Sequence, residues 1–166
     1  MATIPDGLTI GGYYPGSIGR IVLAHALYYY EDWGFDASFE AQVARELGEF
    51  IGVFDPIRDG FWTARFNGTF AGSIAINGNS GNPDGARLRW FIVASGFRGM
   101  GLGNVLISNA VKFCRETGHK SIFLWTFRGL EAARILYEKN GFTLAQETPV
   151  EQWGGSILEQ KYELIL

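Results

Sequence analysis

Apolar residues in the first part of the chain recur at spacings that predict a short strand and then two helices. The strand is expected over about residues 8–13. The first helix has apolar or aromatic side chains at helical spacing, namely Ile18, Val22, His25 and Tyr29. Ser17 is its expected N-cap. The second helix is predicted to begin at Asp36, and its apolar stripe consists of Phe39, Val43 and Leu47.

In the middle of the chain, strands that pair as a hairpin give way to strands that are joined by a helix. Alternating runs flank Asn67-Gly68, which is a strong signal for a two-residue hairpin turn. After the glycine-rich loop at 77–85, an apolar strand is expected at about 86–94, followed by a helix. The run SIFLWTF at 121–127 is apolar on both faces, and it therefore predicts a central strand parallel to 86–94.

The C-terminal part of the chain completes the predicted sheet. A short helix containing Tyr137 is expected to end at Gly141, because glycine suits the left-handed residue after a helix. Two last strands, at about 142–153 and 156–165, are expected to be joined by the glycine pair 154–155. The order of elements is typical of a mixed α/β fold, with one partly antiparallel sheet of about seven strands and about four helices.

Length and composition fit a single domain that spans residues 1–166. Apolar residues make up 47% of the chain and include 13 Phe, 7 Tyr and 5 Trp, which is enough to build a core. No apolar run approaches the roughly 18 residues of a membrane span, no secretory signal is visible, and Cys114 cannot pair within the chain. We therefore expect a cytoplasmic protein with no membrane partner.

The net charge of −3 is unevenly distributed along the chain. Residues 1–60 hold nine acidic and three basic residues, whereas residues 61–166 hold eight acidic and eleven basic residues. This asymmetry fits an ordinary solvated surface, and it fits equally an acidic half that receives a cation and a basic half that receives an anion. No concentrated basic face is present, so nucleic acid is not an expected partner.

One glycine-rich stretch stands between the predicted strand 86–94 and the helix that follows it. It reads FRGMGLGNVL and contains, in order, Arg98, Gly99, Gly101 and Gly103. It is neither a P-loop nor a dinucleotide motif, because no Gly-Lys-Ser/Thr follows and Leu106 stands where the third glycine is required. Such glycines can serve tight packing alone. They also expose backbone N–H groups at a positively polarised helix N-terminus, which is a phosphate-binding arrangement.

Two segments resemble motifs of the GNAT superfamily of N-acetyltransferases. Arg98-x-x-Gly101-x-Gly103 is similar to the family's R/Q-x-x-G-x-G/A motif and likewise stands at the start of a helix after an apolar strand. AARILYEKNGF, residues 132–142, resembles the family's A-x-x-x-Y-x-k-x-G-F segment. The order of elements fits over essentially the whole chain. The sequence also resembles the acetyltransferase half of bacterial fusions with MarR-type regulators, although no DNA-binding half is expected here.

The resemblance implies acetyl-CoA as the co-substrate and no metal. Its pyrophosphate would be held by the backbone around the motif, formed by Arg98, Gly99, Met100, Gly101, Leu102, Gly103 and Asn104. Main-chain groups of Phe91, Ile92 and Val93 would pair with the pantetheine arm as an additional strand does. Leu130 stands where Asn is common and Ser95 where Pro is frequent, so cofactor contacts at these two positions are left open.

Acetyl transfer from a thioester to an amine needs few catalytic groups. The resemblance implies that Tyr137 protonates the departing thiolate, since a phenol with a pKa of about 10 stays protonated at neutral pH. The alternative is that Tyr137 only packs on an apolar helix stripe. A backbone N–H at the end of strand 91–93 would stabilise the oxyanion. Many family members carry a Glu base near this strand, but RLRWFIV offers Arg87 and Arg89, so no general base is predicted.

By the same resemblance, the first two helices would form the wall of the acceptor pocket. The candidate substrate residues are His25, Tyr28 and Glu31, with Asp32, Asp36 and Glu40 as further carboxylates. His25 also fits a core position, Asp36 fits a helix cap, and at most two of Tyr28, Tyr29 and Tyr30 can face one pocket. The acidic first half favours a primary amine of a small molecule or a protein, whereas its aromatic residues suit an acceptor with an apolar body.

Two further interpretations stay open at the level of the sequence. A non-catalytic acyl-CoA-binding or sensor protein would keep the glycine turn without a competent acceptor site. The C-terminal hairpin, QWGGSILEQKYELIL, would offer a homodimer contact as in the family that the chain resembles. The sequence alone selects neither the acceptor nor the oligomeric state.

Overall fold

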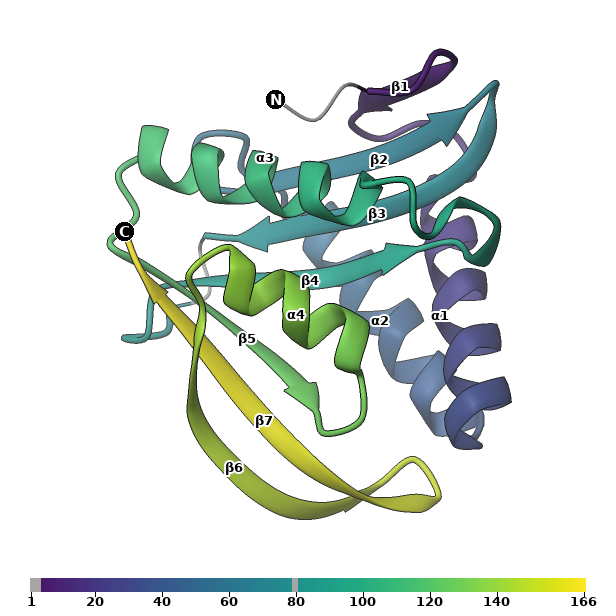
Figure 1. The fold of residues 1–166 in the computed structure, drawn as a ribbon, viewed down its shortest axis with the longest axis vertical. Coiled ribbons are helices and arrows are strands. Elements are labelled where there is room, and N and C mark those ends of the chain that lie inside the picture. The colour runs from purple at the N-terminus through teal and green to yellow at the C-terminus, as the bar shows by residue number, and fades with distance from the viewer. Residues whose placement is uncertain (1–3, 79–80) are drawn as a thin grey trace.

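A single mixed sheet organises the protein. The computed structural model describes residues 4–78 and 81–166, and within them the sheet has seven strands (Figure 1). They are β1 (Leu8–Gly11), β2 (Gly60–Phe66), β3 (Thr69–Asn77), β4 (Ala86–Val93), β5 (Ser121–Phe127), β6 (Thr143–Gln152) and β7 (Gly155–Ile165). Their order is β1-β2-β3-β4-β5-β7-β6, and only the central pair β4 and β5 is parallel among these described strands.

Helices cover both faces of the sheet. The helices α1 (Ser17–Trp33) and α2 (Ala37–Gly52) lie on one face, and α3 (Leu102–Glu116) and α4 (Glu131–Lys139) lie on the other (Figure 1). A short 3-10 turn, Ser95–Phe97, precedes α3. The predicted α/β fold with seven strands and four helices is confirmed. None of the helices in the described part of the chain is long and apolar enough to cross a membrane.

Two apolar clusters hold these helices to the sheet. The cluster beneath α3 and α4 includes Ile76, Leu106, Ile107, Leu124 and Tyr162. The cluster beneath α1 and α2 includes Ile21, Phe35, Leu47, Trp90 and Phe127. Burial of each such side chain stabilises the fold by roughly 1.5–3 kcal/mol. The sheet is therefore fixed from both sides, and its two faces have separate cores.

The parallel strands β4 and β5 pair only where they begin. Ala86 pairs with Ile122 and Arg87 with Phe123, and the parallel ladder has no further pairs among the described residues. Beyond this point β5 stays paired with β7 along its whole length, from Ser121–Ile165 to Phe127–Glu159. Figure 1 shows β4 and β5 diverging towards their C-terminal ends. The sheet consequently opens in its middle.

A bulge in β4 changes the direction of its side chains beside this opening. The register with β3 shifts between Ser73 and Ala75, and Trp90 adopts the left-handed region with φ 46°. Leu88 packs in the cluster beneath α3 and α4, whereas Trp90, two residues further on, packs in the cluster beneath α1 and α2. The buried hydroxyl of Ser73 donates a 2.7 Å hydrogen bond to the carbonyl of Trp90. This bond holds the bulge in place.

Local capping and turn signals are mostly confirmed, with two corrections. Asp36 caps α2, because its side chain accepts a hydrogen bond from the Ser38 amide at 2.9 Å. Ser17 is not the cap of α1, which is preceded instead by Gly16 in the left-handed region with φ 91°. The hydroxyl of Ser17 accepts a hydrogen bond from the Tyr14 amide instead, which ties the preceding loop to the helix.

The second correction concerns the turn between β6 and β7. The turn residues are Trp153 and Gly154, with φ 54° and 85°, rather than the glycine pair 154–155. Positive φ at both positions is what a type I′ hairpin requires, as Asn67-Gly68 also shows with φ 47° and 82°. With the turn at this position, the Trp153 indole contacts Phe35 and Phe39 on the α2 side.

Candidate active site

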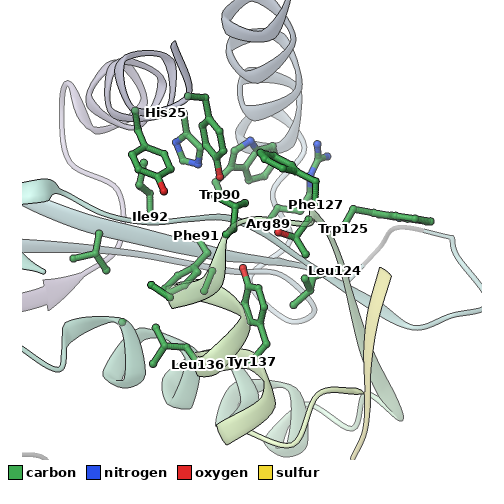
Figure 2. Close-up of a pocket in the computed structure, with 18 of the residues that line it drawn as sticks. His25, Arg89, Trp90, Phe91, Ile92, Leu124, Trp125, Phe127, Leu136 and Tyr137 are labelled. Carbon is green, nitrogen blue, oxygen red and sulfur yellow. The ribbon is translucent and has the colours of Figure 1, made fainter. Parts of the chain in front are cut away.

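A cavity of about 1080 Å³ lies where β4 and β5 diverge. Its lining comes from both sides of the sheet, that is from α1 and α2 on one side and from α3 and α4 on the other. Figure 2 shows His25 and Tyr137 approaching the sheet from opposite faces, with residues of β4 and β5 between them. The cavity therefore connects the two faces through the opening in the sheet.

The glycine turn forms the α3 side of the cavity. Gly99 and Gly101 have φ of 77° and 80°, and Gly101 precedes α3 without a side-chain cap. Among the described residues, no acceptor is found for the backbone N–H groups from Gly99 to Asn104. Consecutive free amides at a helix N-terminus attract anions, because they add to the positive end of the helix dipole. This row of amides fits a diphosphate.

Gly103 has a different reason for being glycine. It lies in the first turn of α3, and a Cβ there would stand 2.7 Å from a methyl group of Leu136 and 3.4 Å from the ring of Phe91. The side chain of Asn104 accepts a 3.1 Å hydrogen bond from Asn140, so it joins α3 to the end of α4. Met100 is exposed and does not line the cavity, so only its backbone belongs to the turn.

Tyr137 projects from α4 towards the opening in the sheet. Its ring is only 6% exposed and lies 6.0 Å from the rings of Phe91, Phe142 and Tyr162. Figure 2 shows its hydroxyl pointing away from α4 towards the gap between β4 and β5. Burial, followed by the nearby hydroxyls of Tyr29 and Tyr162, raises the pKa of Tyr137, so its proton stays in place at neutral pH. The ring packs, and the hydroxyl faces the cavity.

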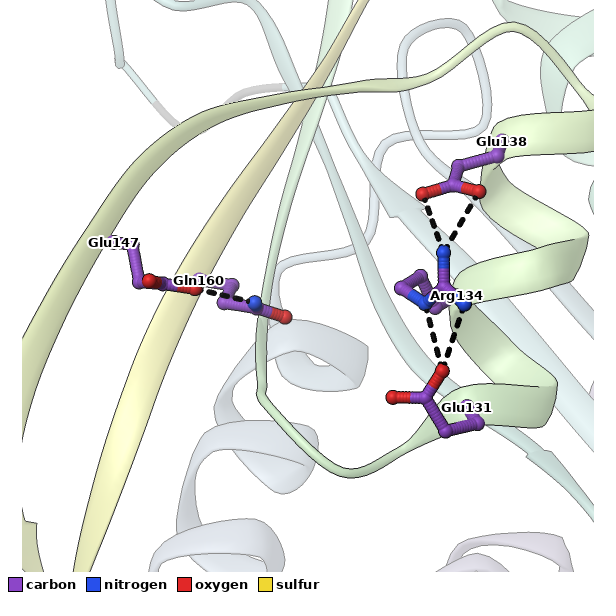
Figure 3. Close-up of polar contacts among 5 residues, drawn as sticks. All are labelled: Glu131, Arg134, Glu138, Glu147 and Gln160. Carbon is purple, nitrogen blue, oxygen red and sulfur yellow. Dashed lines mark hydrogen bonds and ion pairs between the residues drawn. The ribbon is translucent and has the colours of Figure 1, made fainter.

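The outer surface of α4 carries an ion-pair network, shown in Figure 3. Arg134 lies between two carboxylates of the same helix, at 2.8 Å from Glu131 and 3.0 Å from Glu138. Gln160 on β7 donates a 2.7 Å hydrogen bond to Glu147 on β6. These groups line a smaller hollow of about 390 Å³ outside α4. Solvent screens exposed pairs of this kind, so the network is a modest support for α4.

On the α1 side, His25 is buried and uncharged. Its Nδ1 lies 2.8 Å from the carbonyl of Ile21, which can only accept, so Nδ1 carries the proton and Nε2 is left as an acceptor. Burial lowers the pKa of His25 to about 4, although the Ile21 carbonyl acts in the opposite direction. His25 lines the cavity and stacks on Tyr29 with 6.2 Å between ring centres.

Tyr28 links the α1 side to the glycine turn. The guanidinium of Arg98 lies 4.6 Å above the Tyr28 ring, and its Nε donates a 3.2 Å hydrogen bond to the carbonyl of Val93. Tyr28 and Tyr29 both line the cavity, whereas Tyr30 is 67% exposed. Helical geometry predicts that at most two of these three tyrosines face one pocket, and the two that do are Tyr28 and Tyr29.

Glu31 lies outside this cavity, on the exposed surface of α1. It follows Tyr29 by two residues, which places it about 200° around a helix of 3.6 residues per turn. The other predicted carboxylates of the acceptor wall, Asp32, Asp36 and Glu40, are also exposed and do not line the cavity. Of the acidic residues in the first 60, Glu46 alone lines the cavity among the described residues, so the acidic surplus is not gathered at this site.

Several polar residues of the α2 side were not singled out from the sequence. The indole Nε1 of Trp153 donates a 2.9 Å hydrogen bond to Gln42, and Gln42 donates a 3.3 Å hydrogen bond to Glu46. Glu46 also forms an ion pair with Arg89. Gln42 and Glu46 sit beside the apolar stripe of α2, which was the only sequence signal for them. The turn at Trp153 is far away in the chain, so its contribution depends on the tertiary fold.

Leu130 and Ser95, which depart from the motifs that the sequence resembles, differ in their position relative to the cavity. Leu130 lines it and precedes α4 without a side-chain cap. Ser95 lies in the 3-10 turn and is exposed. Leu130 therefore offers no side-chain hydrogen bond at the cavity wall, whereas Ser95 lies outside the cavity, on the approach to the glycine turn.

Known protein families and structures resemble the chain over most of its length. The model of the acetyltransferase (GNAT) family matches residues 24–142. An uncharacterized N-acetyltransferase of Methanocaldococcus jannaschii is 26% identical over 120 residues, which are 70% of this chain and 53% of that protein. The matched region thus spans about half the length of this relative. The further resemblance to fusions with MarR-type regulators stays a prediction.

Solved structures share the fold. An acetyltransferase from Streptococcus agalactiae superposes with a TM-score of 0.76 at 22% identity, over 97% of this chain and 99% of the other. A ribosomal L7/L12 α-N-protein acetyltransferase, solved in complex with coenzyme A, has a TM-score of 0.72 at 12% identity, over 99% and 97% of the two chains. The arrangement of strands and helices is therefore one that known acetyltransferases use.

Proposed function

Because the chain belongs to the acetyltransferase (GNAT) family, we propose that it transfers the acetyl group of acetyl-CoA to a primary amine. The observation that carries this proposal is the row of free backbone amides from Gly99 to Asn104, next to a cavity that crosses the sheet. The acceptor is an amine of a small molecule or of a protein. A structural neighbour solved with coenzyme A supports the choice of donor.

The donor side of the cavity offers two kinds of contact for coenzyme A. The amides of residues 99–104 would hold the pyrophosphate through the helix dipole and directed N–H groups. The backbone of Phe91, Ile92 and Val93 borders the opening that β5 leaves, so it can pair with the pantetheine arm as a strand would. Acetyl-CoA supplies an acetyl group that is already activated as a thioester.

The reaction exchanges one bond for another. A bond forms between the amine nitrogen and the acetyl carbon, the carbon–sulfur bond breaks, one proton leaves the nitrogen and one proton reaches the sulfur. Tyr137 is the proton donor in this proposal, because its protonated hydroxyl faces the cavity. The burial that raises the pKa of the Tyr137 phenol would also raise the pKa of a coenzyme A thiol in the same place. The difference between the two pKa values therefore changes less than either value does.

His25 acts in this proposal as a hydrogen-bond acceptor for the amine. Its Nε2 is free of the proton, which sits on Nδ1 and faces Ile21. A pKa of about 4 makes the imidazole too weak a base to keep the amine proton at neutral pH. The proton therefore passes on to water in the cavity, and His25 orients the nitrogen that loses it.

The alternative is a protein that binds acyl-CoA without transferring the acyl group. The two functions are separated by incubating the protein with acetyl-CoA and a library of primary amines, while the release of free thiol is measured. An acetyltransferase releases thiol with at least one amine. A sensor is stabilised against heat by coenzyme A and releases none with any of them, and that result would overturn the proposal.

Replacing Tyr137 by Phe tests the proton donor. We expect kcat to fall by roughly 100-fold or more, which is the usual contribution of a general acid. Stability and coenzyme A affinity should hardly change, because the substitution keeps the buried ring and its aromatic contacts and removes only the hydroxyl. Steady-state kinetics and calorimetric titration with coenzyme A measure the two effects.

The matched control is Tyr30→Phe, which removes a hydroxyl from an exposed tyrosine outside the cavity. Its kcat should equal that of the unchanged protein. If Tyr137→Phe shows the same unchanged rate, Tyr137 only packs and the acid lies elsewhere.

A further inference from the structure

Arg87 is an unpaired charge in the wall of the cavity. It lies on β4, is half-buried, and its Nε is fully buried without a hydrogen-bond partner. No ion pair among the described residues includes it. Burial and the neighbouring Arg89 lower the pKa of Arg87 to about 10, so the guanidinium remains charged at neutral pH. Buried donors of a charged group without acceptors are costly, and such groups usually meet a partner.

The neighbouring carboxylates do not provide this partner. Glu46 is bound to Arg89 and also accepts the hydrogen bond from Gln42, which in turn is held by Trp153. Arg89 is further fixed by its own neighbour, because its guanidinium lies 4.2 Å above the Trp90 ring. These contacts engage Glu46 with Arg89. Glu46 also attracts Arg87 through space, but it forms no ion pair with Arg87 among the described residues.

Glu159 is the remaining carboxylate on this side of the cavity. It lies on β7 opposite Phe127 and attracts Arg87 through space, but it forms no ion pair with it. His25 is neutral and adds no negative charge. The α2 side of the cavity thus combines two guanidinium groups with two carboxylates. Arg89 and Glu46 form an ion pair, whereas the buried Nε of Arg87 has no hydrogen-bond partner among the described residues.

We propose that the acceptor is a small amino carboxylate, whose carboxylate binds Arg87 while its amine reaches the opening beside Tyr137. This inference rests on the proposed acetyl transfer. A guanidinium offers parallel N–H groups that match the two oxygens of a carboxylate, and such charge-assisted bonds are strong in a cavity with little water. The Glu159 carboxylate would attract the positive amine of the same molecule, and the neutral His25 would not repel it.

The position of Arg87 on β4 suits an acceptor whose carboxylate binds Arg87 while its amine lies beside Tyr137. Arg87 precedes Phe91 by four residues, so the two Cα atoms lie at most about 13 Å apart, which is the span of a regular strand with a rise of roughly 3.3 Å per residue. An acceptor that bridges this distance is held at both ends, and its amine is directed along β4 towards the proposed acetyl group.

The test compares amino acids with the amines that remain when their carboxyl group is removed, such as tyrosine with tyramine and lysine with cadaverine. In the unchanged protein, thiol release from acetyl-CoA should show a kcat/KM roughly 10- to 100-fold higher for the carboxylate member of each pair. In Arg87→Met the preference should fall to about threefold or less, through a higher KM. Arg87→Lys, which keeps the charge but not the planar fork, should restore part of it.

Arg45→Met is the matched control, since Arg45 is an exposed arginine of α2 outside the cavity. Its preference should remain that of the unchanged protein. Binding of a carboxylate without the amine, 3-(4-hydroxyphenyl)propanoate, to the coenzyme A-loaded protein is measured by calorimetry. It should bind the unchanged protein and lose roughly tenfold or more in affinity in Arg87→Met.

The outcomes separate this inference from the function on which it rests. Equal kcat/KM within the pairs, or a preference and a carboxylate affinity that Arg87→Met leaves intact, would overturn the role of Arg87 while acetyl transfer stands. Failure of every amine to release thiol would instead remove the proposed function. The calorimetric result would still decide whether the cavity binds a carboxylate through Arg87.

Discussion

Gly99, Gly101 and Gly103 occupy different backbone environments within one short turn. Gly99 and Gly101 have positive φ and open space around the position of a Cβ, so their requirement is conformational. Gly103 is helical and faces Leu136 and Phe91 closely, so its requirement is steric. The two explanations that the sequence left open for these glycines, exposed amides and tight packing, therefore apply to different members of the same motif.

Gly101→Ala should weaken the binding of coenzyme A. An L-residue held at φ 80° costs about 1–2 kcal/mol, and relaxing this strain would turn the amides of the turn away from a common anion. Gly118→Ala is the matched control, because Gly118 also has φ 80° and open space but follows the other end of α3. Both variants should lose similar stability in urea unfolding, and only Gly101→Ala should lose coenzyme A affinity by calorimetry. Equal affinities would mean that the turn does not hold the cofactor.

At the scale of elements, β4 is the strand on which the site depends. It pairs with β3 on one side, is free of β5 beyond Arg87, and carries the bulge at Trp90. A tryptophan in the left-handed region is strained by about 1–3 kcal/mol and persists only where its surroundings hold it. The packing of Trp90 against Phe50 and the hydrogen bond from Ser73 provide this support.

Ser73→Ala should reduce both stability and activity. It removes the 2.7 Å hydrogen bond to the Trp90 carbonyl and should cost about 1–3 kcal/mol in the free energy of unfolding. Thr63→Val is the matched control on the neighbouring strand, because the buried Thr63 hydroxyl donates an equally short bond to Gly12. Both should lose stability in urea unfolding, but only Ser73→Ala should lower kcat, through displacement of Phe91 to Val93. A similar kcat in the two variants would separate the bulge from catalysis.

Elements with a local signal could be predicted from the sequence, and details that depend on distant contacts could not. Asn67-Gly68 and Asp36 were placed correctly, because a type I′ turn and a helix cap are determined by neighbouring residues. The predicted turn at 154–155 is wrong by one residue. The position of the turn goes with contacts of the Trp153 indole with Phe35 and Phe39, which are distant in the chain. The sequence predicts Ser17 as a cap because it does not show that Gly16 adopts the left-handed region.

At the scale of the whole molecule, the two faces of the sheet differ in how far the sequence describes them. The α3 side could be described residue by residue, because the glycine motif and the Tyr137 segment are continuous in the chain. The α2 side brings together Glu46, Arg87 and Trp153, which are separated by strands and helices. The acidic surplus of the first 60 residues suggested carboxylates at the acceptor, but only the packing of α2 shows that Glu46 is the one that lines the cavity.

The free energy of unfolding of the whole chain should depend on pH through His25. Its pKa is about 4 in the folded protein and 6.5 when exposed, so the unfolded chain binds one more proton between these values. Stability is therefore fully present above pH 6.5 and decreases by about 3 kcal/mol as the pH falls to 4. Urea unfolding of the unchanged protein and of His25→Phe at pH 7 and pH 4 isolates this contribution. Identical pH dependence of the two proteins would show that His25 is not buried as an uncharged group.

The opening between β4 and β5 also has a consequence for how such a protein can change over time. In the proposed reaction the donor and the acceptor would reach it from opposite faces, and each face has its own helices and its own core. Substitutions in α2 or at the tip of the β6–β7 hairpin alter one entrance and leave the turn before α3 untouched. Substitutions can thus change which acceptor is bound while the binding of the donor is kept.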